Sequence, residues 1–160
     1  MVSKEVEKLL LKVQKPGRYV GGELNEVIKD KKKVDCRFAF CFPDTYEVGM
    51  SHLGMKILYS LMNAVPYIWC ERVFAPWVDM EEEMIKHNIP LYALESGDPV
   101  SDFDFIGFTL QYELSFTNML NMLRLSGVPI KSCDRKELKN IVVAGGPRAD
   151  CRFCRYFLHR

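Results

Sequence analysis

The sequence predicts an α/β fold built on a doubly wound, mostly parallel sheet of about five strands. Two observations lead to this prediction. Five short apolar segments are bounded by turn residues, and amphipathic stretches of about ten to fifteen residues separate several of them. Strands that alternate with helices of this length form βαβ units with right-handed crossovers. We therefore expect an open sheet that carries helices on both faces.

The first 33 residues are expected to form a helix and an extended lead-in. Val6, Leu9, Leu10 and Val13 recur at helical spacing, which predicts a helix over 3–14 with Ser3 as its N-cap. Pro16-Gly17 ends this helix. The following 24–30 segment is expected to be extended or a short strand.

Five segments carry the strand pattern. The strongest is 36–42, which is rich in aromatic residues and is stopped by Pro43. The others are 67–73, 91–94, 103–110 and 139–144, the last being a short β-branched run. For a sheet of this kind we expect the strand order 2-1-3-4-5, as in flavodoxin-like (Rossmann-like) folds.

Three further helices are expected between these strands, over 51–63, 76–87 and 115–125. The first has Ser51 as a natural N-cap. The last ends at Gly127. In the second, Val78, Met84 and Ile85 are expected to face inward. The apolar stripe of the first consists of Leu53, Ile57, Leu58 and Leu61.

Length and composition describe one folded domain. The chain has 160 residues, of which 48% are hydrophobic and 27% charged, which excludes a disordered, collagen-like or coiled-coil protein. No apolar run approaches the roughly 20 residues of a membrane span, and the amino terminus lacks the apolar core of a secretory signal. We therefore expect a cytoplasmic protein with no membrane partner.

Charge is distributed unevenly along the chain. Residues 1–33 carry nine basic and five acidic side chains, and 148–160 carry four Arg and one Asp, so the segment between them is acidic. Nucleic-acid-binding domains present a basic face interleaved with aromatic residues on the folded body. We therefore expect no nucleic-acid partner.

Three loops are the candidate site, because ligands of open α/β sheets bind outside the carboxyl ends of the strands. They are 43–54, 109–113 and 145–147, and we expect them to converge on one crevice. Several nucleotide sites are excluded: the sequence has no Gly-x-Gly-x-x-Gly after a strand, no P-loop, no acidic pair of a receiver domain and no Ser/Thr/Gly-rich flavin phosphate loop.

The pattern of these loops is closest to that of cobalamin-binding domains, Asp-x-His-x-x-Gly followed by a hydroxyl element and then Gly-Gly. Asp44 and Gly49 have the required spacing, with Tyr46 in the place of His. A neutral Tyr is a poor ligand for a soft metal, so any bound corrin is expected to lack a histidine ligand to cobalt. His52 is expected to be a polar residue in the first turn of a helix. The candidate cofactor-binding residues are Asp44, Tyr46, Gly49, Ser51, Gly54, Thr109, Gln111, Gly145, Gly146 and Pro147.

Four segments, 18–23, 42–54, 71–77 and 106–114, resemble the amino-terminal, cobalamin-binding-like region of an uncharacterised family of radical S-adenosylmethionine (SAM) proteins. The resemblance spans about residues 10–147 and implies a cobalamin-binding-like α/β domain over 34–147. It also implies a radical SAM catalytic domain as a partner in cis. A 4Fe–4S cluster and SAM would be held by that downstream domain and not by this chain, for which we predict no catalytic residue and no metal ligand.

Two alternatives remain open. In the first, the pocket is vestigial and the domain is a scaffold that docks a radical domain without binding corrin; large side chains from Tyr46, Met50 or Tyr112 filling the crevice would favour it. In the second, the chain is a small enzyme that uses Asp44, Glu47 or Glu113 as acid or base, although no His or Cys pairs with them in the sequence.

The segment 148–160 departs from the family pattern. Cys151 and Cys154 are followed by no third Cys at radical SAM spacing, and the surrounding residues are basic. We interpret the segment as a divergent tail, typical of a truncated or frame-shifted reading frame, and expect one sheet face to be partly uncovered. Cys36, Cys41 and Cys70 lie in apolar runs, where cysteine acts as a small hydrophobic residue.

Overall fold

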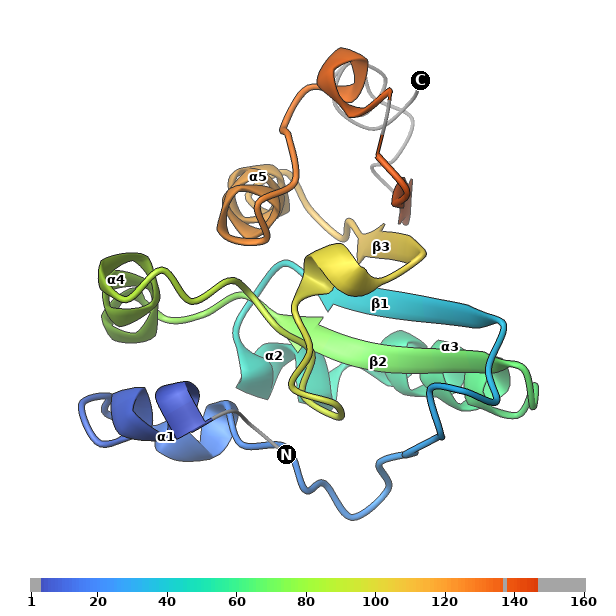
Figure 1. Cartoon of the computed structure of the whole chain (residues 1–160), viewed down its shortest axis with the longest axis horizontal. Coiled ribbons are helices and arrows are strands. Elements are labelled where there is room, and N and C mark those ends of the chain that lie inside the picture. The colour runs from blue at the N-terminus through green and yellow to red at the C-terminus, as the bar shows by residue number, and fades with distance from the viewer. Residues whose placement is uncertain (1–3, 137, 147–160) are drawn as a thin grey trace.

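The computed structural model describes residues 4–136 and 138–146 and contains a four-stranded, all-parallel sheet. Its strands are β1 (Cys36–Phe42), β2 (Ile68–Phe74), β3 (Phe105–Thr109) and β4 (Ile141–Gly145). They are arranged in the order β2-β1-β3-β4, with β1 between β2 and β3 (Figure 1). This confirms the α/β class and the flavodoxin-like order, but with four strands in the described part of the chain instead of five.

The predicted strand at 91–94 is wrong. Hydrogen bonds to the side-chain carboxylates of Glu95 and Glu71 take the place of backbone hydrogen bonds that would extend the pairing with β2. The Leu94 N–H donates to the Arg72 carbonyl at 2.9 Å, which places this segment against the free edge of β2. One residue on, the Glu95 carboxylate accepts the Arg72 N–H at 2.7 Å. The Ser96 N–H in turn donates to the Glu71 carboxylate at 3.0 Å. The segment therefore covers the edge of β2 without adding a strand.

Helices lie on both faces of the sheet. They are α1 (Lys4–Leu10), α2 (Tyr46–Ser51), α3 (Leu53–Asn63), α4 (Val78–Lys86) and α5 (Ser115–Leu125), with short 3₁₀ turns at Pro16–Arg18, Val100–Asp102 and Ser132–Arg135. The first helix is shorter than its predicted 3–14 range, and the lead-in at 24–30 forms no strand. No helix in the described residues is long and apolar enough to cross a membrane.

The boundary between α2 and α3 differs from the prediction. Ser51 is the last residue of α2, where its hydroxyl donates to the Val48 carbonyl at 2.8 Å. His52 is the N-cap of α3 instead, because its Nδ1 accepts the Met55 N–H at 3.1 Å. The imidazole thus satisfies one of the free N–H groups of the first turn, the polar role expected for it.

Alternate residues of the strands divide the core into two clusters. Ala39 and Cys41 of β1 belong to the larger cluster, with buried side chains of α1, α4 and α5. Phe40 and Phe42 point the other way and pack with Met55 and Tyr59 of α3. The side chains of a strand alternate between faces, so α3 lies on the sheet face opposite α1, α4 and α5.

The apolar stripe predicted for α3 is wrong. Its buried residues are Met55 and Tyr59, whereas Leu53, Ile57, Leu58 and Leu61 are all exposed. Tyr59 decides the rotation of the helix: its hydroxyl accepts the Val27 N–H at 2.8 Å, and its ring lies 4.5 Å below the Arg72 guanidinium. In α4, Met84 is buried as predicted, but Val78 and Ile85 are exposed.

Among the described residues, no helix covers the α3 face of the sheet at β4, where apolar side chains are exposed. Phe38 is paired in register with Phe105, and Phe105 with Ile141, so these residues share one face. The rings of Phe38 and Phe105 stack at 6.1 Å. Beyond them Ile141 and Val143 are 47% and 39% exposed, whereas Val142, which faces the larger cluster, is buried. The expectation from the sequence rested on residues 148–160, which lie outside the described residues.

The lead-in is fastened to the α3 side of the sheet by polar contacts. The indole N–H of Trp69 donates to the Val27 carbonyl at 2.8 Å. The Lys29 ammonium donates to the carbonyls of Asn63, Val65 and Ile68, at 2.9, 2.8 and 2.5 Å. Asn63 is the last residue of α3, so its carbonyl has no partner within the helix, and the Lys29 cation satisfies it.

Candidate functional site

The three predicted loops adjoin one another at the carboxyl edge of β1, β3 and β4. The Tyr112 hydroxyl donates to the Asp44 carboxylate, which joins the first loop to the second. The Leu110 N–H donates to the Gly145 carbonyl at 2.8 Å, which joins the second loop to the third. Asn118 of α5 adds a bond from its side-chain amide to the Pro43 carbonyl at 3.0 Å. The carboxyl ends of neighbouring parallel strands meet at one edge, and these contacts follow from that topology.

Polar groups at this edge bind mostly one another. The side-chain amide of Gln111 donates to the Thr109 hydroxyl at 2.6 Å. The hydrogen bond to Asp44, together with partial burial, raises the pKa of Tyr112 to about 12. The hydroxyl, amide and carboxylate that were expected to meet a ligand therefore hold the loops together in this structure.

The two glycines at the end of β4, Gly145 and Gly146, have different surroundings. Gly146 has φ of +120°, and a Cβ there would lie 2.5 Å from the Leu110 carbonyl oxygen. A side chain is excluded at Gly146 by this backbone approach. A Cβ at Gly145 would meet no atom of the protein within 4 Å. Pro147 lies outside the described residues.

Tyr46 does not face the other two loops. Its hydroxyl donates to Glu23 in the lead-in, and its ring meets Phe74 edge-on at 5.6 Å. Burial, followed by the hydrogen bond to Glu23, raises the pKa of Tyr46 to about 12. The residue in the position of the cobalt-binding His of the pattern is thus turned toward β2.

The remaining glycines of the first loop are packing positions. Gly49 is buried, and a Cβ there would run into the ring of Phe74 and lie 3.2 Å from that of Phe42. At Gly54 a Cβ would lie 3.0 Å from the His52 ring. Both glycines therefore let helices α2 and α3 approach aromatic rings of the protein itself.

These positions do not fit a corrin whose nucleotide tail slides past Gly49. The space beside Gly49 holds the ring of Phe74, and the Asp44 carboxylate is bonded to Tyr112. Of the three large side chains that could fill the site, Tyr112 closes it over Asp44. The Met50 sulfur accepts from Arg72 at 3.4 Å. The three loops still contact one another, and the space beside Gly145 is open.

The acidic residues of the edge have structural partners. Glu47 pairs with Arg18 at 2.8 Å and with Lys15 at 3.4 Å. The hydrogen bond from Arg18 lowers the pKa of the Glu47 carboxyl. A carboxylate held ionised in this way ties the first loop to the lead-in, and it is poorly suited to act as a general base.

The described residues contain no group of three or more His, Cys, Asp or Glu side chains that could hold a metal ion. Cys41 and Cys70 are buried free thiols, and burial raises the pKa of both. They act as small core residues. The Cys151 and Cys154 pair lies outside the described residues.

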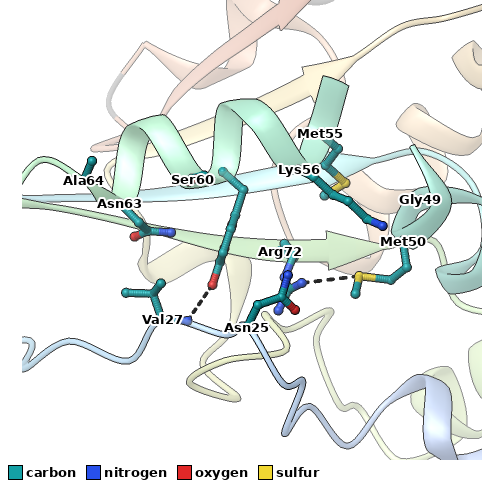
Figure 2. Close-up of a pocket in the computed structure, with 11 residues that line it drawn as sticks. Asn25, Val27, Gly49, Met50, Met55, Lys56, Ser60, Asn63, Ala64 and Arg72 are labelled. Atoms are coloured by element: carbon teal, nitrogen blue, oxygen red, sulfur yellow. Dashed lines mark hydrogen bonds between the residues drawn. The ribbon is translucent and has the colours of Figure 1, made fainter. Parts of the chain in front are cut away.

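A pocket of about 310 Å³ opens elsewhere, between the lead-in, α3 and β2 (Figure 2). It touches the predicted site only at Gly49 and Met50, and Arg72 and Lys56 line it. This pocket was not among the sites predicted from the sequence. A signal was present, because Glu71 and Arg72 interrupt an otherwise apolar strand, and charged residues in such a position are rarely buried without a partner.

Comparison with known proteins identifies the class. Residues 54–153 match the family model described as radical SAM proteins, N-terminal. The match covers more than half of the chain, so the chain belongs to this family, whose members carry a radical SAM catalytic domain in cis. No curated protein and no solved structure matches this chain.

Proposed function

We propose that this domain docks the catalytic domain of a radical SAM protein through an uncovered apolar surface. This α3–β4 surface consists of the exposed apolar side chains on the α3 face of the sheet: Leu53, Ile57, Leu58, Leu61, Ile141 and Val143. Exposed apolar side chains that gather on one face of a folded domain favour an interaction site there. The occupant is the catalytic domain, because the family is defined by its position amino-terminal to that domain.

The single observation that carries the proposal is the rotation of α3. Met55 and Tyr59 are directed to the core, and leucine and isoleucine side chains are left on the outside. In a complex, the apolar surface of Leu61, which is 61% exposed, and of Val143, which is 39% exposed, would be removed from water. The Tyr112–Asp44 bond, which closes the candidate cofactor edge, supports docking without a corrin.

The test uses a radical SAM catalytic domain from a member of this family, produced as a separate chain. Sedimentation velocity is expected to show a one-to-one complex with the present domain. Replacing Leu58 and Val143 together by Glu is expected to weaken it by about tenfold or more, because two charges would have to be desolvated. The matched control is Ile85→Glu, an exposed apolar residue of α4 on the opposite face. Equal affinity of the double variant and the native chain would overturn the proposal.

A second candidate function is corrin binding on the loop surface, without a protein ligand to cobalt. It is favoured by the contact of the Asp44, Leu110 and Gly145 loops at one edge. Titration with hydroxocobalamin, followed by spectral shift and co-elution, separates the two functions. Retention that is abolished by Gly145→Trp, which fills the open space beside Gly145, supports a corrin site; no retention at high micromolar cobalamin excludes it.

A further inference from the structure

We propose that the pocket between the lead-in, α3 and β2 binds a small organic carboxylate through Arg72 and Lys56. The pocket lies on a different flank of α3 from Leu58 and Leu61 of the α3–β4 surface. Residues on a helix advance by about 100° each, so Lys56, Ser60 and Asn63 lie on one flank of α3 and Leu58 and Leu61 on the other. The first three line the pocket.

Arg72 supplies the first argument, because it is 4% exposed and only partly bonded. Its Nε donates to Glu95 at 2.6 Å, and its Nη1 lies 3.4 Å from the Met50 sulfur. Its Nη2 is buried and has no hydrogen-bond partner among the described residues. A buried guanidinium N–H that lacks an acceptor is costly, so an acceptor atom supplied by a ligand would stabilise it.

Charge supplies the second argument. Glu95 balances Arg72 as a buried ion pair, and the carboxylate of Glu23, which accepts the Tyr46 hydroxyl, adds an attraction from a greater distance. Lys56 stands at the rim of the pocket, and its ammonium has no ion pair within the described part of the chain. Figure 2 shows it reaching from α3 toward the space between Arg72 and Met50. A singly charged carboxylate would place one oxygen at Arg72 Nη2 and its charge near Lys56.

The other residues that line the pocket indicate which uncharged part of a ligand would fit. Val27, Met50, Met55 and Ala64 are apolar, and methionine adapts to ligands of varied shape. The volume of about 310 Å³ is at the lower end of the range for small-molecule sites. The geometry therefore favours a short aliphatic or thioether carboxylate over inorganic phosphate, which has no apolar part.

The probes are hexanoate, its uncharged analogue hexanamide, and inorganic phosphate, each titrated into the intact chain and followed by amide NMR shifts. Hexanoate is expected to shift amides of the pocket, including Ser60 and Met50, in a saturable manner. Hexanamide is expected to bind about tenfold more weakly, because it lacks the charge. Failure of hexanoate to shift these amides at millimolar concentration overturns the proposal, and so does equal binding of hexanamide.

Variants locate the site without disturbing the core. Lys56 is exposed, so the Lys56→Gln variant is expected to fold normally. It is expected to weaken hexanoate binding about fivefold to tenfold. Ser60→Phe should fill the pocket and abolish saturable shifts. Lys86→Gln, an exposed lysine of α4, is the matched control and should change nothing. If phosphate produces the same shifts as hexanoate, or if Lys86→Gln weakens binding as much as Lys56→Gln, the interaction is general charge attraction and the proposal fails.

Discussion

The guanidinium of Arg72 and the carboxylate of Glu95 form an ion pair at 2.6 Å, with both side chains nine-tenths or more buried. The neighbouring residue on β2, Glu71, forms the equivalent pair with Arg37 at 2.5 Å on the opposite face of the sheet. Ion pairs on both faces of the sheet therefore connect β2, the edge strand, to its neighbours. One of these charges, Arg72, also forms the floor of the only pocket that we connect with ligand binding in the described residues.

Glu95→Gln is expected to lower the free energy of unfolding by about 3–5 kcal/mol, because it leaves the Arg72 charge buried without a counter-charge. Urea denaturation measures this loss. Lys86→Ala, which removes the exposed Lys86–Glu83 pair, is the control and should cost less than about 1 kcal/mol. A cost for Glu95→Gln as small as that of the control would contradict the role assigned to the pair.

Gly49→Ala is expected to destabilise the fold by about 1–3 kcal/mol, because the added methyl group meets the rings of Phe74 and Phe42. Gly145→Ala should change stability by less than about 0.5 kcal/mol, because nothing lies within 4 Å of the new atom. Thermal unfolding of the two variants compares them directly. Equal stability of both would show that Gly49 is not a packing position.

Tyr112→Phe tests the bond that closes the loop edge. The hydrogen bond to Asp44 raises the folded-state pKa of Tyr112 to about 12, above its ordinary value of about 10. The stability that it contributes is therefore fully present below about pH 10 and is lost as the pH rises toward 12.

The measurement is the difference in unfolding free energy between the native chain and Tyr112→Phe across this pH range. The difference should be constant below about pH 10 and shrink above it. Asp44→Asn in the Tyr112→Phe background should have no further pH-dependent effect in this range. A difference that stays constant from below pH 10 to pH 12 would mean that the bond to Asp44 is absent in solution.

Lys29→Met is expected to cost about 1–3 kcal/mol, because three backbone carbonyls around the end of α3 lose their charged donor. The exposed Lys32→Met is the control. Hydrogen exchange at the amides of the lead-in should rise in Lys29→Met and stay unchanged in Lys32→Met. If exchange there is the same in both variants, the lead-in is held by other contacts.

Local pattern predicted most of the elements of this protein. The aromatic run at Cys36–Phe42 and the range Ser115–Leu125 coincide with β1 and α5 to the residue. Both are segments in which propensity, periodicity and boundary residues agree. The sequence also indicated that the Asp44 loop and the glycine pair adjoin at one edge of the sheet, because that arrangement follows from strand order alone.

Sequence by itself determined the α/β class and the parallel strand order, because these depend on the alternation of apolar and amphipathic segments, and its resemblance to radical SAM proteins agrees with the family model that it matches. Tertiary structure alone decided that 91–94 covers an edge and that α3 turns Leu58 outward. It also decided that Arg72 lines a pocket. The reason is physical: each outcome rests on contacts between residues far apart in the chain, such as Tyr59 with Val27 or Arg72 with Glu95, whose strength depends on burial that no local pattern encodes.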